Sequence, residues 1–195
     1  MDPFEYVVVI TSLISGLGIA QILTGTADII SGLKNIKLSG SLSLMVFTTF
    51  LNLIQEWYYN YQYATHVASW TLLVVLGLLI YPILLFVLAR MLFPTGLKSG
   101  VTDLRAYFQE QWKWLYGISI SIIVVSAFHD VFYSGFTLLD QTPKFIIISS
   151  YLFFIVLDVK SQKAHFIFQL FQTAGVVGFI VFTDSPLIDY NLINE

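Results

Sequence analysis

Three ionisable side chains in otherwise apolar sequence are the residues best suited to chemistry: Glu56, His129 and its neighbour Asp130. Glu56 follows the middle of an apolar stretch centred near Leu51, and the His–Asp pair follows the middle of another centred near Ile123. If both stretches are membrane helices, a rise of about 1.5 Å per residue places all three groups roughly 8–10 Å from the midplane, on the same side. The sequence therefore predicts that these side chains can meet.

Ionisable groups inside a membrane cost about 2.5–3.5 kcal/mol each to insert, so a chain that keeps them usually supplies a partner or a water-filled cavity. A histidine beside a carboxylate can also exchange protons near neutral pH. We therefore interpret Glu56, His129 and Asp130 as an outer site that binds a cation or relays protons. The main alternative is a hydrogen-bonded clamp between helices. A metal or haem site ranks below both and we expect no cofactor, because the sequence has no Glu-x-x-His pair.

Further polar residues extend this set along the same helices. Asn52, Gln55 and Tyr59 lie on the same apolar stretch as Glu56. Asn52, four residues before Glu56, and Tyr59, three residues after it, share its helix face. Two glutamines on the last apolar stretch would continue the line toward the other side of the membrane. Amide bridges between helices are an equally weighted alternative to a polar path. The predicted pathway residues are Asn52, Gln55, Tyr59, Gln169 and Gln172.

Motifs of the common enzyme classes are missing from the sequence. It carries no Gly-x-Ser-x-Gly elbow, no His-Glu-x-x-His, no phosphate loop and no dinucleotide fingerprint. We expect no enzyme, although His129 and Asp130 as the acid–base pair of a lipid-modifying enzyme remain a third alternative. The chain has no cysteine, which excludes disulfides and thiolate sites, and its net charge of −3 argues against nucleic-acid binding.

The elements that must position these residues follow from the composition. The 195 residues are 57% hydrophobic and 11% charged, with a mean hydropathy of +0.80. No water-soluble domain of this length could bury so much apolar surface, so we expect an all-α integral membrane protein in which residues 1–195 form one transmembrane domain. The six expected spans are about 4–30, 41–61, 70–92, 112–133, 145–157 and 164–182, with a cytoplasmic surface helix over about 97–113.

The basic residues predict the orientation of the chain. Eight of the nine fall into three alternate gaps between the apolar stretches. Because short loops rich in Lys and Arg stay cytoplasmic, we expect six spans with both termini outside. Only Lys144 breaks this pattern. No basic region precedes the first stretch and no small-residue cleavage site follows it, so we expect it to remain as a span, and a bacterial inner membrane with periplasmic termini fits these features.

The packing of the six stretches is specified only in part. The first carries a row of small residues, Ser12, Gly16, Ala20 and Thr24, at i, i+4 spacing. Small residues let neighbouring backbones approach closely in lipid, so we expect this row to face the inside of the bundle, with Gly18 and Gly25 extending that face. A three-plus-three arrangement of two oppositely oriented halves is open, but no motif shared by the halves supports it.

The leading hypothesis is a channel or transporter for an ion or small solute, with the acidic and histidine residues as its outer site. The alternative is a non-catalytic membrane subunit or sensor that oligomerises or docks a partner protein. Its docking residues would be Lys98, Arg105 and Lys113 on the cytoplasmic surface helix. In the bilayer we expect a homo-oligomer, since closed symmetric assemblies are the common case.

Overall fold

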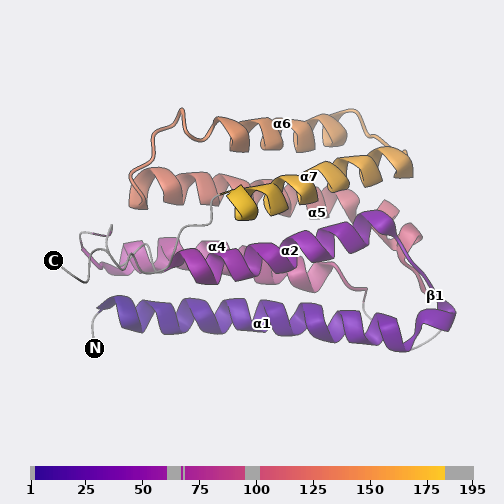
Figure 1. Cartoon of the computed structure of the whole chain (residues 1–195), viewed down its shortest axis with the longest axis horizontal. Helices are drawn as coiled ribbons and strands as arrows, with labels where there is room; N and C mark the ends of the chain where they lie inside the picture. The colour runs from indigo at the N-terminus through magenta and orange to yellow at the C-terminus, as the bar shows by residue number, and fades with distance from the viewer. Residues whose placement is uncertain (1–2, 61–66, 68, 95–101, 183–195) are drawn as a thin grey trace.

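The computed structural model describes residues 3–60, 67, 69–94 and 102–182, and within them the chain is all-α with two very short strands. Figure 1 shows the helices lying side by side, with consecutive helices running in opposite directions. The α-helices of the described residues are α1 (Pro3–Ser31), α2 (Gly40–Tyr59), α4 (Leu72–Met91), α5 (Leu104–Tyr133), α6 (Thr142–Val156) and α7 (Gln162–Phe182).

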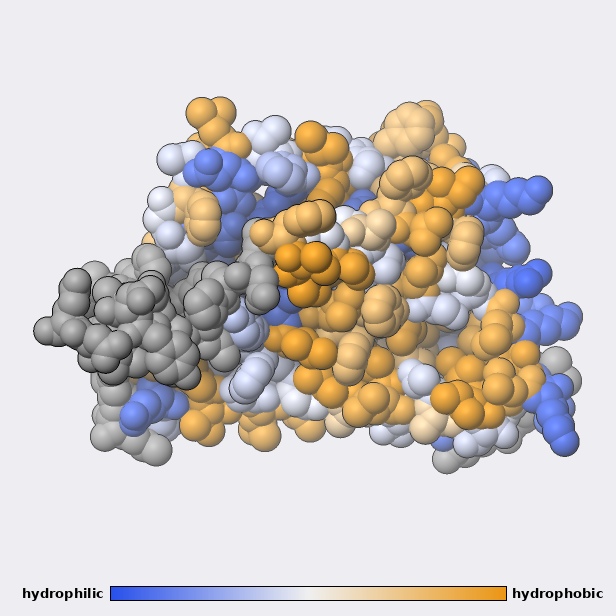
Figure 2. Space-filling model, in the orientation of Figure 1, coloured by the Kyte–Doolittle hydropathy of each residue, from blue (hydrophilic) through white to orange (hydrophobic). Residues whose placement is uncertain are grey.

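Four of these helices, α1, α4, α5 and α7, are long and apolar enough to cross a membrane, and α6 is a shorter apolar helix. Their outer faces carry large apolar side chains: Leu73 is 80% exposed and Phe171 is 73% exposed. Figure 2 shows this apolar surface over the middle of the bundle, with hydrophilic side chains at the end where the short strands lie. An apolar surface of this extent is typical of a protein embedded in a membrane.

The core lies where α4 and α5 cross the middle of the bundle. Leu53, Leu85, Leu92 and Leu115 are fully buried there, and Tyr116 is also buried completely. Helix α4 packs on α1, α2 and α5, whereas α7 packs on α2 and α6 packs on α5. The bundle therefore has α4 in contact with α1, α2 and α5, with α1 also packed on α2, α7 added on α2 and α6 added on α5.

Helix α5 corrects the prediction of a separate surface helix over 97–113. It is one continuous helix of 30 residues that begins at Leu104, and residues 97–101 of the predicted element lie outside the described residues. The apolar side chains expected on the membrane surface, among them Phe108 and Trp112, are buried in the core instead. A helix that lies on a membrane and one that packs in a bundle have the same apolar periodicity, so the sequence pattern does not separate them.

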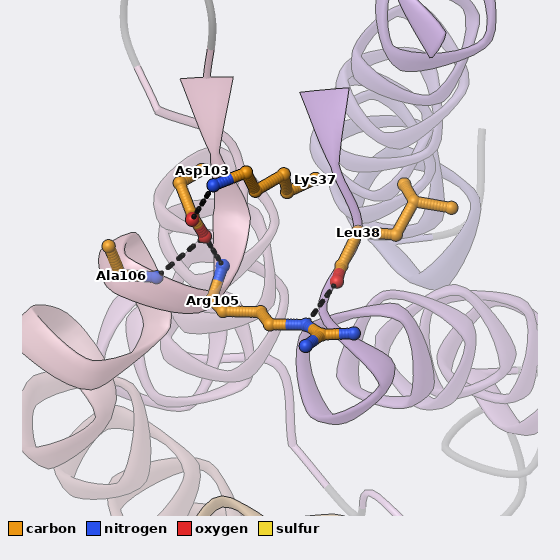
Figure 3. A network of polar contacts seen from close by, with 5 residues as sticks. All are labelled: Lys37, Leu38, Asp103, Arg105 and Ala106. Atoms are coloured by element: carbon orange, nitrogen blue, oxygen red, sulfur yellow. Dashed lines mark hydrogen bonds and ion pairs between the residues drawn. The ribbon is translucent and has the colours of Figure 1, made fainter. Parts of the chain in front are cut away.

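The start of α5 is tied to the connection between α1 and α2. Strands β1 (Ile36–Lys37) and β2 (Thr102–Asp103) pair in parallel, and the Lys37 ammonium lies 3.5 Å from the Asp103 carboxylate. Asp103 also caps α5 by accepting from the backbone N–H groups of Arg105 and Ala106, and the Arg105 side chain donates to the Leu38 carbonyl at 3.0 Å (Figure 3). We call these contacts the strand clamp.

Helix α1 packs through the part of the predicted small-residue set that contains Gly18 and Gly25, and not through the row from Ser12 to Thr24. Gly16, Ala20 and Thr24 are exposed on the outside of the bundle. The packed face instead carries Gly18, where an added Cβ would lie 2.9 Å from Leu53, and Gly25, where it would collide with the Phe93 ring. Small residues occur on two faces of this helix, so their spacing alone does not identify the buried face.

Candidate functional site

A cavity of about 780 Å³ lies between α2, α4, α5, α6 and α7. Its size falls in the range of about 300–1,000 Å³ that is usual for small-molecule sites. The structure brings all eight predicted site and pathway residues to the wall of this one cavity. They are Glu56, His129, Asp130, Asn52, Gln55, Tyr59, Gln169 and Gln172.

Helix α2 supplies the largest polar face of the cavity. Thr49, Asn52, Glu56 and Tyr59 recur at helical spacing, and all four line the cavity. The helix begins after Ser39, whose side chain accepts a hydrogen bond from the Leu42 backbone N–H. The polar face of α2 therefore points inward, to the cavity and not to lipid.

A hydrogen bond holds α2 against α7. The hydroxyl groups of Thr48 and Thr173 lie 2.8 Å apart, and Thr173 also donates to the backbone of its own helix at Gln169. This contact fixes the rotation of α7, so that Gln169 and Gln172 face the cavity.

The Glu56 carboxylate is almost fully buried, with 7% of the residue exposed. It lies beside the amide of Asn60, one turn further along the chain, and close to Tyr81 of α4. No Lys or Arg among the described residues forms an ion pair with it. Glu56 therefore supplies a buried acidic group to the cavity without a basic partner from this part of the chain.

His129 is also buried and is oriented by α4. Its Nε2 lies 3.0 Å from the Gly77 carbonyl, and because a carbonyl only accepts, Nε2 carries the hydrogen. The ring lies 6.0 Å from Tyr81 and 5.5 Å from Tyr133 between centroids. A Cβ at Gly77 would lie 2.7 Å from the Tyr133 hydroxyl, so the absence of a side chain there lets α5 approach closely.

Asp130 forms an ion pair with a residue that the sequence analysis did not assign to the site. Lys144 of α6 places its Nζ 2.6 Å from Asp130 Oδ2 and 2.7 Å from the Ser126 hydroxyl. Both charged side chains are about one-third exposed or less and line the cavity. The one signal in the sequence was the position of Lys144, the single basic residue outside the cytoplasmic pattern.

The structure corrects the prediction that Glu56 touches His129 or Asp130. The three residues share a cavity, but within the described part of the chain no hydrogen bond or ion pair joins Glu56 to the other two. His129 is held by α4 and Asp130 by α6. The rise per residue predicts a position along each helix, but it leaves the direction around each helix axis undetermined.

The outer end of the cavity is formed by the connection between α5 and α6. There Asp140 accepts from the backbone N–H and the hydroxyl of Thr137, both at 2.7 Å, and these bonds lower the pKa of Asp140. Gln141, which is 2% exposed, follows directly, and its Oε1 is buried without a hydrogen-bond partner among the described residues. Buried polar atoms normally have a partner, so this acceptor marks a place for water or a ligand.

At the end away from the α5–α6 connection the cavity abuts an aromatic cluster, through Tyr151, whose ring lies 4.9 Å from that of Tyr116 between centroids. Tyr116 donates to His165 Nδ1 at 2.8 Å, and His165 Nε2 donates to the Val159 carbonyl at 2.7 Å. The rings of Phe108 and Trp112 pack against the same histidine. Ser119 and Gln169 line the cavity. Tyr116 and His165, one turn before them on α5 and α7, do not.

The chemistry available in the cavity is ion pairing, hydrogen bonding and proton exchange. Among the described residues no three His, Cys, Asp or Glu side chains are grouped closely enough to hold a metal ion. Comparison with protein-family models, with curated proteins and with solved structures gives no match to this chain. The cavity and its residues therefore carry the functional inference alone.

Proposed function

We propose that the protein is a small multi-pass membrane channel or transporter for an ion or small solute, with Glu56, His129 and Asp130 in its outer half. The observation that carries this proposal is the single cavity that collects all eight predicted polar residues from three helices. In a membrane, ionisable groups that share a cavity between helices are typical of ion, proton and substrate sites.

Six spans are part of the proposal. Helix α2 has 20 residues, enough for about 30 Å, and its low hydropathy comes from polar side chains that face the cavity. Helix α6 has only 15 residues and would cross by tilting or by local thinning of the bilayer. Eight of the nine basic residues lie in the connections after α1, α4 and α6 or in the flanking parts of the helices. We therefore assign these connections to the cytoplasm and both termini to the outside, the periplasm of a bacterial inner membrane.

In this orientation the cavity reaches inward from the outer connection of α5 and α6 and ends at the aromatic cluster. Such a shape suits a transporter with its site accessible from outside and its inner path closed. Access from the inside would require α7 to move relative to α5. That movement would break the Tyr116–His165 hydrogen bond and the packing of Phe108 and Trp112 on His165.

Ion and proton flux into proteoliposomes tests the proposal. The natural sequence is compared with Glu56→Gln, which keeps the shape and removes the charge, and with Glu110→Gln, the same change on the exposed surface of α5. We expect flux from the natural protein and Glu110→Gln, and its loss in Glu56→Gln at equal reconstituted amounts. The absence of flux from all three monodisperse proteins would contradict the proposal.

A sensor or subunit is the second candidate, favoured by the closed inner end of the cavity. A ligand held there would be bound without passing through. Of its predicted docking residues, Arg105 already donates to the Leu38 carbonyl and Lys113 pairs with Asp158 at 2.6 Å, while Lys98 lies outside the described residues. The outward row of small residues on α1 is the face that we assign to a second copy in this candidate. Size-exclusion chromatography with light scattering, comparing Gly16→Leu with the natural chain, tests that assignment.

A further inference from the structure

The charges around the cavity do not balance. Lys144 neutralises Asp130 through the 2.6 Å ion pair, while Glu56 has no Lys or Arg partner among the described residues. Asp140 adds a further carboxylate at the outer end. The cavity wall therefore holds three carboxyl groups and one ammonium group, an excess that favours a cation over an anion.

The wall around Glu56 suits an organic cation better than a metal ion. The described residues provide no cluster of three metal-ligating side chains. Aromatic rings are close to the carboxylate instead: Tyr59 lies one turn away on α2 and contacts Phe179 with ring centroids 6.3 Å apart, and Tyr81 approaches from α4. Aromatic faces beside a carboxylate attract ammonium groups through their quadrupoles.

The remaining wall is largely apolar. Ile122 and Ile123 of α5, Ile147 of α6 and Val176 of α7 line the cavity opposite the polar face of α2. A hydrated inorganic ion gains nothing from such side chains, whereas an apolar group of an organic cation buries its surface against them. The volume of about 780 Å³ also exceeds what a single dehydrated ion fills.

Two buried amide atoms of the cavity wall lack hydrogen-bond partners among the described residues, the acceptor Oε1 of Gln141 and the donor Nε2 of Gln169, and the acceptor is compatible with the same ligand class. The Oε1 atom of Gln141 is buried, lacks a hydrogen-bond partner among the described residues, and belongs to a residue that lines the cavity. An unpaired buried acceptor costs free energy until it receives a donor. The N–H groups of a protonated amine are such donors.

We propose that the cavity binds a protonated organic amine with an apolar group, and that Glu56 is its counter-ion. This inference rests on the proposed function in one respect, since it names the solute class of the same site. The ammonium lies at the Glu56 carboxylate beside the tyrosine rings, and the apolar group packs on the isoleucine wall. The Asp130–Lys144 pair remains intact and contributes no net charge.

Isothermal titration calorimetry on the purified full-length protein in detergent tests the inference with three soluble probes of one shape. Benzylammonium is the cation, benzyl alcohol the neutral control and benzoate the anion. We expect saturable binding of benzylammonium only. Glu56→Gln should weaken it at least about tenfold, because a charge-assisted hydrogen bond is lost, and Glu110→Gln should leave it unchanged.

Equal binding of benzyl alcohol, or full retention of benzylammonium binding by Glu56→Gln, would overturn the inference. If Glu56→Gln does not fold, the comparison of the three probes on the natural protein still tests the inference. A site that does not select for positive charge would bind benzylammonium no better than benzyl alcohol. Failure of the inference is separable from failure of the transport proposal. Glu56-dependent ion flux without benzylammonium binding refutes only the solute class, and binding without any flux refutes only transport.

Discussion

Lys144 and Asp130 form the ion pair that joins α5 to α6, with Nζ 2.6 Å from Oδ2, and both residues line the cavity. Lys144 is the one basic residue that lies outside the three alternate gaps that hold the other eight. Its ion pair with Asp130 gives a reason for its position. A Lys that is neutralised by a neighbouring carboxylate presents no free positive charge to the membrane. The exception to the pattern is thus a structural contact.

Replacement of Lys144 by Met should destabilise the protein by about 1–3 kcal/mol, because Asp130 keeps its charge in a partly buried position and loses its partner. Asp130→Asn should also destabilise it, and the double variant should recover most of the loss. Thermal unfolding in detergent measures the cycle. Lys163→Met, the same change at an exposed position, is the control, and additive losses in the double variant would contradict the pairing.

Two glycines of α1 should differ sharply in their tolerance of alanine. A Cβ at Gly25 would collide with the buried Phe93 ring, whereas no atom lies within 4 Å of a Cβ at Gly16. We expect Gly25→Ala to cost about 1–3 kcal/mol through overpacking. Gly16→Ala should be neutral or slightly stabilising, because alanine has the higher helix propensity. Equal unfolding midpoints for the two variants would show that the packed face of α1 has been wrongly assigned.

The strand clamp should weaken in acid. Hydrogen bonds from the backbone N–H groups of Ala106 and Arg105, and the Lys37 ammonium, lower the pKa of Asp103. A carboxyl whose pKa is lower in the folded state stabilises the fold above its unfolded pKa, and this contribution is lost as the pH falls through the folded value.

Asp103→Asn should therefore lower the unfolding midpoint at pH 7. The difference from the natural chain should shrink below about pH 4, the usual range of an Asp side chain, and disappear once Asp103 is protonated. Unfolding curves at a series of pH values give the comparison. A difference that stays constant down to pH 3 would mean that the Asp103 charge contributes nothing to the clamp.

The six-span orientation can be read directly from cysteine labelling, because the natural chain has no cysteine and gives no background. Leu139, 83% exposed between α5 and α6, and Lys34, exposed between α1 and α2, lie at opposite ends of the bundle. In intact bacterial cells a membrane-impermeant maleimide should label Leu139→Cys at once and Lys34→Cys only after permeabilisation. The reverse order would invert the topology, and labelling of both in intact cells would exclude an odd number of crossings between them.

Much of the fold could be predicted from apolar periodicity, since α1, α2, α4, α6 and α7 begin and end within a few residues of the expected spans, whereas α5 begins eight residues before its expected start at 112. The position of the polar groups along each helix was also predictable, because helix rise is constant, and Glu56, His129 and Asp130 do line one cavity. What the sequence could not supply is rotation about each helix axis. That rotation decides that His129 meets Gly77 and Asp130 meets Lys144, and neither of them Glu56.

The same limit applies to α1 and α5. On α1 the row that begins at Ser12 and the row that contains Gly18 and Gly25 both have small residues, and only packing against Leu53 and Phe93 selects the second. On α5 the side chains of Phe108 and Trp112 suit a membrane surface and a protein core equally well. Which of the two they meet depends on helices far away in the sequence.

The strand clamp also has a consequence for the order of synthesis. Arg105 and the carbonyl of Leu38 that it contacts are 67 residues apart in the chain, with α2 and α4 between them. The clamp cannot close until both intervening helices have left the ribosome and entered the membrane, and until the start of α5 has followed them. The clamp needs no residue of α6 or α7, so it can close before these two cavity-forming helices have been made.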